Sequence, residues 1–243
     1  MAAGNLDSYM RTRIHELDLI KTLAIVLMVV YHLIYDLKEF ANFPIDYHAL
    51  FWHTLQKTSA LLFIFVSGVS SGLSRNPLRQ GLKIFSYGLI ITAITYLVMP
   101  EQYVRFGILH FLGVATLILF FLRKQKIPVL IILAILSATI GFTLNKLYLP
   151  TPLLLPIGVK YPEFGSVDYF PIFPYLSVSI LGLIAYRLFY MKARRENPGF
   201  LQPRRTFLPI SLSSSLSKHS LMIYLVHQPL LLGAIFTFLA LAR

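Results

Sequence analysis

Seven stretches of predominantly apolar residues recur along the chain, each close to the roughly 20 residues that a helix needs to cross about 30 Å of hydrocarbon. Helices are expected because hydrocarbon offers the backbone no other hydrogen-bond partners. The stretches lie at 17–37, 55–74, 82–99, 106–122, 127–144, 172–191 and 219–240. We therefore predict an all-α, polytopic membrane helix bundle of about seven transmembrane helices, forming a single transmembrane domain over 1–243.

Composition supports a multi-pass protein of the cell membrane and argues against nucleic acid as a partner. The chain is 56% hydrophobic and only 13% charged, against about 25% charged residues in soluble domains. Its net charge of +12 comes from Lys and Arg in short clusters between apolar stretches, not along one basic face. Most of the 22 basic residues fall on one side of the bilayer if the N-terminus is cytoplasmic, which predicts that orientation. The absence of cysteine excludes disulfides, thiolate metal sites and cysteine nucleophiles.

Two connections are long. The inner one, 192–217, is basic and then rich in serine, which predicts a cytoplasmic surface loop. The outer one, 145–171, is too apolar for a free loop and too rich in proline for a straight helix. It is expected either to cover the outer face or to be an ordered connector.

A polar stripe runs along the first apolar stretch. With helical periodicity, Asp18, Lys21, His32 and Asp36 fall within about 60° of one another on the helix surface. Ionisable groups inside a bilayer cost about 2.5–3.5 kcal/mol each on insertion scales, so their presence indicates a function. The stripe predicts an inner polar pair, Asp18 and Lys21, and an outer pair, His32 and Asp36.

The predicted topology gathers most of the histidines toward the outer half of the membrane: His32, His48, His53, His110 and His227. Arg105, Asp168 and Gln228 are expected near the same side. A neutral imidazole accepts a proton near neutral pH, and a neighbouring carboxylate can orient its other ring nitrogen. The spacing of His32 and Asp36 allows such a contact. A metal site is not expected, because a single His-x3-Asp is a weak pattern.

Five sequence blocks resemble, in order, the heparan-alpha-glucosaminide N-acetyltransferase catalytic-domain family, a group of transmembrane acyltransferases with small prokaryotic members. The blocks are "RIHELDLIKTLAIVLMVVYHLIYDL" (13–37), "FIFVSGVSSGLS" (63–74), "FGILHFLG" (106–113), "VDYFPIFPYLSVSILGL" (167–183) and "HSLMIYLVHQPLL" (219–231). The resemblance covers nearly the whole chain. It implies transfer of the acetyl group of cytoplasmic acetyl-CoA to a sugar amine or hydroxyl, or another glycan acceptor, at the outer face.

The resemblance also implies site residues. Polar positions of the prokaryotic pattern match His32, Asp36, His110, Asp168, His227 and Gln228, and the catalytic histidine of the eukaryotic enzyme is best matched by His48, near Trp52. The general base is expected to be His48, His32 or His110, oriented by Asp36 or Asp168. Arg105, Tyr224 and Gln228 are expected to bind the acceptor.

Acetyl-CoA is expected at the inner end of the bundle. Its phosphates would be attracted by Lys21 with neighbouring bases, and the expected donor-binding set is Arg13, Asp18, Lys21, Arg75 and Arg79. Lys21 stands where the family often has arginine, which differs from lysine in its bidentate contact with phosphate.

Two other functions are compatible with the residues. A proton-coupled transporter or channel for a small polar solute would use a buried His and Asp chain equally well. A structural subunit explains the hydrophobicity but not the outer histidines. The sequence leaves open the acceptor, the identity of the base and whether the chain forms a homo-oligomer.

Overall fold

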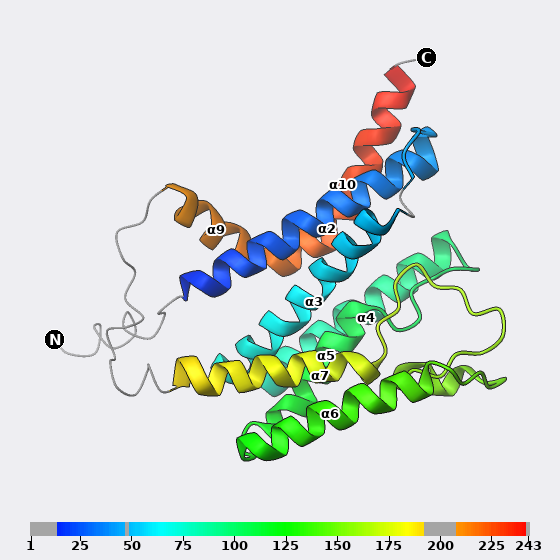
Figure 1. Cartoon of the computed structure of the whole chain (residues 1–243). Helices are drawn as coiled ribbons and strands as arrows, with labels where there is room; N and C mark the ends of the chain where they lie inside the picture. The colour runs from blue at the N-terminus through cyan, green and yellow to red at the C-terminus, as the bar shows by residue number, and fades with distance from the viewer. Residues whose placement is uncertain (1–13, 47–48, 192–207, 242–243) are drawn as a thin grey trace. The chain divides into compact units, whose positions relative to one another are not determined.

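The computed structural model describes residues 14–46, 49–191 and 208–241. The regular elements of these residues are helices, with two isolated bridges between Phe106 and Tyr169 and between Tyr148 and Lys160. In chain order they are α2 (His15–Ala41), α3 (Leu50–Leu73), α4 (Pro77–Val98), α5 (Ile108–Leu122), α6 (Ile127–Leu144), the 3-10 helix η1 (Pro152–Ile157), α7 (Ile172–Ala185), its π-helical continuation η2 (Tyr186–Met191), α9 (Leu208–Lys218) and α10 (Ser220–Leu241) (Figure 1).

Each of the seven predicted spans lies on a helix. In the described part of the chain, five helices are long and apolar enough to cross a membrane: α2, α4, α6, α7 with η2, and α10. Helix α5 is strongly apolar but has 15 residues. Helix α3 has 24 residues, but its first half includes the polar side chains of His53, Thr54, Gln56 and Lys57, so its apolar part is shorter.

The chain divides into two compact units, and one boundary along the sequence falls within α3, between Phe63 and Ile64. The first unit contains α2, the first part of α3, α9 and α10, with both α9 and α10 packed on α2 (Figure 1). Ser59 of α3 donates to the carbonyl of Ala24 at 2.9 Å, and Thr22 donates to the carbonyl of Ser213 at 3.0 Å. Side-chain bonds to backbone carbonyls therefore join the helices of this unit.

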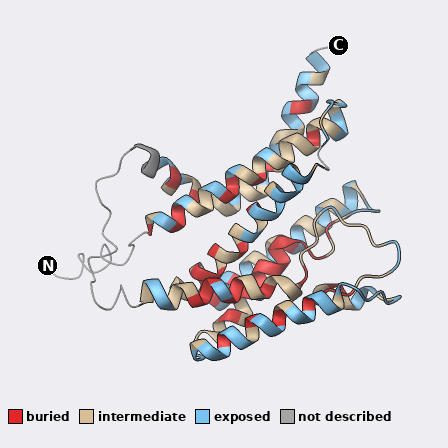
Figure 2. Ribbon diagram, viewed as in Figure 1, coloured by how far each residue is buried: buried red, intermediate tan, exposed pale blue. Residues whose placement is uncertain are grey.

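The second unit contains the end of α3 and all elements from α4 to η2. Helices α4 and α5 form one closely packed pair, α6 and α7 form another, and α5 also packs on α7. Most residues of α5 are buried, including Phe111 and Leu119, and the buried residues concentrate where α5 lies (Figure 2). An apolar helix enclosed in this way forms the core of the unit.

Large apolar side chains are exposed along the outer faces of the long helices. Examples are Leu23 and Val26 on α2, Ile132 and Ile135 on α6, and Phe238 on α10, each more than 40% exposed. Exposed apolar bands on helices of this length match the hydrocarbon of a bilayer. The chain is a multi-pass membrane protein.

The long connection between α6 and α7 is ordered. Within the connection, the N–H of Leu149 donates to the carbonyl of Lys160 at 3.0 Å. Two further backbone hydrogen bonds join it to the α4–α5 connection: Val167 N–H donates to Gln102 O at 2.9 Å, and Phe170 N–H donates to Phe106 O at 2.8 Å. The other long connection is only partly described. The surface loop predicted over 192–217 overlaps α9 (Leu208–Lys218), so that prediction is wrong for residues 208–217.

Candidate active site

Two histidines from helices far apart in sequence meet in the first unit. His32 on α2 and His227 on α10 have ring centroids 4.7 Å apart and ring planes at 83°, which is an edge-to-face contact. Tyr31 packs edge-on against His32, and Tyr224 lies beside His227 with centroids 5.6 Å apart. The structure thus brings together three residues that the sequence predicts for the site: His32, His227 and Tyr224.

Backbone carbonyls fix which nitrogen of each ring carries its proton. Nδ1 of His32 lies 2.9 Å from the carbonyl oxygen of Met28, and Nδ1 of His227 lies 2.7 Å from that of Tyr224. A carbonyl oxygen only accepts, so hydrogen bonding assigns the proton to Nδ1 in both rings. In the neutral ring Nε2 then holds the basic lone pair. The pair therefore offers two Nε2 atoms that can accept a proton.

The two rings differ in accessibility. His227 is buried, and its Nε2 has no hydrogen-bond partner among the described residues. His32 is half-buried. His32 is therefore the more exposed ring of the two.

Asp36 is held by the other helix of the pair. Its side chain is fully buried, and Nε2 of Gln228 donates to its two carboxylate oxygens at 2.8 and 3.0 Å. The predicted contact in which Asp36 orients His32 is wrong, because the carbonyl of Met28 takes the Nδ1 proton of His32. Gln228, predicted to bind the acceptor, instead uses its donor group to join α10 to α2. Its Oε1 is buried and has no partner within the described chain.

His110, in the second unit, has both ring nitrogens engaged. Nδ1 accepts from the backbone N–H of Gly107 at 3.3 Å. Nε2 lies 3.4 Å from the hydroxyl oxygen of Thr92, and that hydroxyl donates to the carbonyl of Val104 at 2.6 Å. The ring proton is therefore on Nε2 and points to Thr92. This arrangement joins α4, α5 and their connection and leaves no ring nitrogen to act as a base.

Asp168 caps α5. Its Oδ2 accepts from the backbone N–H of Ile108, the first residue of the helix, at 2.9 Å. A carboxylate at a helix N-terminus is favoured by the unpaired N–H groups and by the helix dipole. A Cβ on Gly107 would lie 2.2 Å from the same oxygen, so only glycine leaves room for this cap.

The predicted donor-binding residues have separate environments. Asp18 is buried on α2 and accepts from the hydroxyls of Ser217 at 2.6 Å and Ser214 at 2.9 Å, both on α9. Lys21 is half-buried on the same helix, whereas Arg75 and Arg79, in the second unit, are exposed around the start of α4. Arg13 and His48 lie outside the described residues. Ser214 and Ser217 were not predicted, since a serine-rich stretch gives no signal for a distant carboxylate.

Arg105 lies in the second unit and lines a cavity of about 660 Å³ between the α4–α5 and α6–α7 connections.

Within the residues that the structure describes, no group of three or more His, Cys, Asp or Glu side chains could hold a metal ion.

Comparison with known proteins gives one finding. The family model described as "Heparan-alpha-glucosaminide N-acetyltransferase, catalytic" matches residues 13–229. No curated protein and no solved structure matches the chain. The match covers His32 and Asp36 on α2 and His227 and Gln228 on α10. The chain belongs to the heparan-alpha-glucosaminide N-acetyltransferase catalytic-domain family.

Proposed function

We propose that the chain is an acetyl-CoA-dependent N- or O-acetyltransferase of the cell membrane. Seven helices form one transmembrane domain with a cytoplasmic N-terminus, and the acetyl group passes from cytoplasmic acetyl-CoA to a sugar amine or hydroxyl at the outer face. The family match supports the reaction class, and the positive-inside asymmetry of Lys and Arg supports the orientation.

The observation that carries this proposal is the distance of 2.9 Å between Nδ1 of His32 and the carbonyl oxygen of Met28. With its Nδ1 proton held by Met28, its Nε2 can act as the general base. The acceptor's N–H or O–H gives its proton to Nε2 while the acceptor atom bonds to the acetyl carbonyl carbon. The bond from that carbon to sulfur breaks, and the departing thiolate takes the proton to give free CoA. This route needs no acetyl-enzyme.

The other histidines have different roles in the proposal. His227 positions His32 through the edge contact of their rings, and the Asp36–Gln228 bonds hold α10 against α2 so that this contact persists. His110 and Asp168 position the start of α5. His48 remains a second candidate base on the strength of the resemblance alone.

Donor binding is assigned to the basic residues that the sequence predicts. Lys21, Arg13, Arg75 and Arg79 attract the CoA phosphates from the cytoplasmic side. Asp18 acts indirectly, because its two serine bonds hold α9 on the cytoplasmic end of α2. Tyr224, beside His227, contributes to acceptor binding, and Gln228 acts indirectly through its bonds to Asp36.

The test is release of free CoA thiol from acetyl-CoA by detergent-purified protein, with and without a panel of amino sugars. We expect amino sugars to stimulate release by the wild type and His32→Ala to lower the stimulated rate by about 10²–10⁴-fold, the usual contribution of a general base. His219→Ala is the matched control, since Nδ1 of His219 also lies 3.0 Å from a carbonyl one turn earlier, that of Ser215, but its ring is exposed.

Equal rates for His32→Ala and His219→Ala would remove His32 from the chemistry. No release by the wild type, together with no thermal stabilisation by CoA, would overturn the acetyltransferase and favour a proton-coupled transporter.

A further inference from the structure

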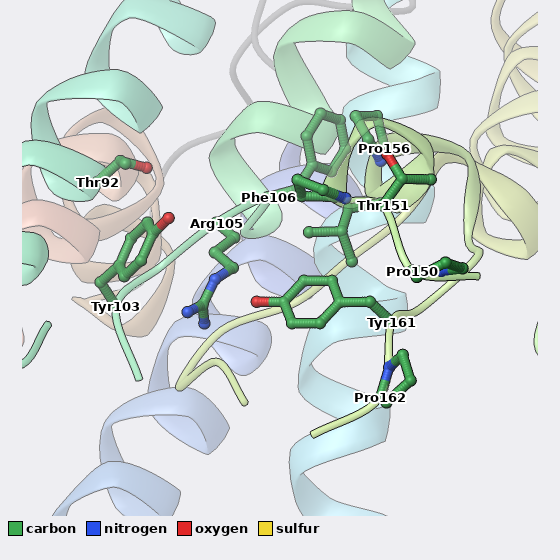
Figure 3. A pocket seen from close by; sticks show the side chains of 11 residues that line it. Thr92, Tyr103, Arg105, Phe106, Pro150, Thr151, Pro156, Tyr161 and Pro162 are labelled. Atoms are coloured by element: carbon green, nitrogen blue, oxygen red, sulfur yellow. The ribbon is translucent and has the colours of Figure 1, made fainter. Parts of the chain in front are cut away.

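The cavity beside Arg105 combines one cation with aromatic and apolar walls. Figure 3 shows the Arg105 side chain between the rings of Tyr103 and Tyr161. The apolar part of the lining consists of Phe106, Leu155 and the prolines of the α6–α7 connection: Pro150, Pro152, Pro156 and Pro162. Its volume of about 660 Å³ is in the range of small-molecule sites, which are mostly apolar with a few polar groups that fix orientation.

The walls are held in place by hydrogen bonds between the two connections. The Ser166 hydroxyl donates to the carbonyls of Tyr103 at 3.0 Å and Asp168 at 2.9 Å. The Tyr169 hydroxyl donates to the carbonyl of Leu155 at 2.8 Å. Burial, with a smaller effect of Tyr175, raises the pKa of Tyr169 to about 12, so this hydroxyl keeps its proton at any physiological pH. The cavity is therefore formed before any ligand arrives.

The charge of Arg105 is not neutralised within the described part of the chain. Its guanidinium carbon lies 4.2 Å from the centroid of the Tyr103 ring and 5.9 Å from that of Tyr161. Its N–H groups donate to the carbonyls of Gly165 and Glu101. No carboxylate of the described residues forms an ion pair with it. A guanidinium has five N–H donors, so some remain for a ligand.

We infer that this cavity binds a sugar that carries one anionic group. The guanidinium of Arg105 binds the carboxylate or phosphate, because its planar N–H groups can pair with two oxygens at once. The sugar ring packs against the tyrosines and the apolar side chains of the lining. Exposed Glu163 directly follows the lining residue Pro162 in the sequence, and its negative charge disfavours a second anionic group. The inference goes beyond the proposed function, because it assigns a ligand to a cavity formed by the second unit alone.

Calorimetric titration of the purified full-length protein tests the inference, with glucuronic acid and glucose 6-phosphate as probes and glucose as the neutral control. No acetyl-CoA is present, so the result does not depend on the proposed transfer reaction. We expect an anionic probe to bind at least about tenfold more tightly than glucose, because glucose has no anionic group to form charge-assisted hydrogen bonds with Arg105. Arg105→Gln should remove this preference, and Tyr161→Ala should weaken both anionic and neutral sugars.

Arg123→Gln is the matched control. Arg123 is also half-buried and lies over an aromatic ring, 4.4 Å from the centroid of Phe120, but it does not line the cavity. Its replacement should leave the preference unchanged. Arg105→Lys, which keeps the charge and loses the planar fork, should give an intermediate affinity.

Two results would overturn the inference. One is equal affinity of the wild type and of a folded Arg105→Gln protein for the anionic probes, and the absence of any probe binding by the wild type would count in the same way. The other is loss of probe binding in nanodiscs of phosphatidylglycerol but not of phosphatidylcholine, which would assign the cavity to a lipid headgroup.

Discussion

In the histidine pair, each ring is oriented by a backbone carbonyl of the preceding helical turn. Met28 and Tyr224 hold the Nδ1 protons of His32 and His227, so both rings keep Nε2 for chemistry without help from a carboxylate. Asp36 is therefore not needed to orient His32. Its carboxylate accepts from Gln228 and so joins α2 to α10. A buried carboxylate with amide donors on a neighbouring helix is a strong link in a low-dielectric interior.

Replacing Gln228 by leucine tests this link. The change removes the donor that faces the fully buried carboxylate of Asp36, and leaving such a group unsatisfied costs about 1–3 kcal/mol or more. We expect a clear fall in the unfolding temperature of the detergent-solubilised protein, and a smaller fall for the double variant Asp36→Leu/Gln228→Leu, which leaves no unpaired charge.

Thr237→Val is the control on the same helix. The Thr237 hydroxyl donates only to the carbonyl of Gly233 one turn earlier and is exposed, so its loss should leave stability unchanged. If Gln228→Leu is as stable as Thr237→Val, the Asp36–Gln228 bonds do not hold the two helices.

The sequence predicted which side chains meet in the first unit better than how they meet. Helical periodicity put His32 and Asp36 on one face of α2, and the family resemblance pointed to His227 and Gln228 on α10. The partners could not be predicted, because a histidine at a given position can bond to a backbone carbonyl or to a carboxylate with nearly equal local geometry. For the same reason His110 was predicted as a base, although Gly107 and Thr92 occupy both of its nitrogens.

At the scale of elements, glycines bring α3 and α7 into backbone contact in the second unit. A Cβ on Gly68 would lie 2.1 Å from the carbonyl oxygen of Ser179, and one on Gly182 would lie 2.2 Å from that of Phe65. Small residues at such positions let helices in a membrane approach closely and gain dispersion energy. The stretch from Ser67 to Gly72 therefore packs against a helix at Gly68.

Gly182→Ala should disrupt this contact. The added methyl group has no space against the backbone of α3, and overpacking of a close contact costs about 1–3 kcal/mol. We expect a lower unfolding temperature in detergent for Gly182→Ala.

Gly233→Ala on α10 is its control, since nothing lies within 4 Å of a Cβ there and alanine also favours the helix. Equal stability of the two variants would show that α3 and α7 do not pack through these glycines.

The length of the apolar stretches was enough to predict the helices that a bilayer would enclose. Every predicted span lies on a helix, including the 15-residue α5. Helix α9 was missed because its serines have modest helix propensity and no apolar run marks it. What identifies it is a tertiary contact, the bonds of Ser214 and Ser217 to Asp18 on α2, nearly 200 residues earlier.

At the scale of the whole molecule, the proposed function requires one face to meet acetyl-CoA and the other to meet the acceptor. The proposed orientation places the turn after α5 in the cytoplasm and the turn after α6 outside. Lys124 and Lys146 are exposed residues of these two turns.

Because the chain has no cysteine, single cysteines report this orientation directly. We expect a membrane-impermeant thiol reagent to label Lys146→Cys in intact cells, and to label Lys124→Cys only after the membrane is permeabilised. The reverse pattern would invert the orientation, and labelling of both in intact cells would mean that α6 does not span the bilayer.

Transfer across a sealed membrane tests the central claim most directly. Wild-type protein is reconstituted in proteoliposomes that enclose glucosamine, and radiolabelled acetyl-CoA is added outside, where it reaches the molecules whose cytoplasmic face points outward. The account predicts acetylated sugar inside the vesicles for wild type and for His219→Ala, and almost none for His32→Ala. Glucosamine that crosses the membrane unmodified, with no acetylated product on either side, would contradict it.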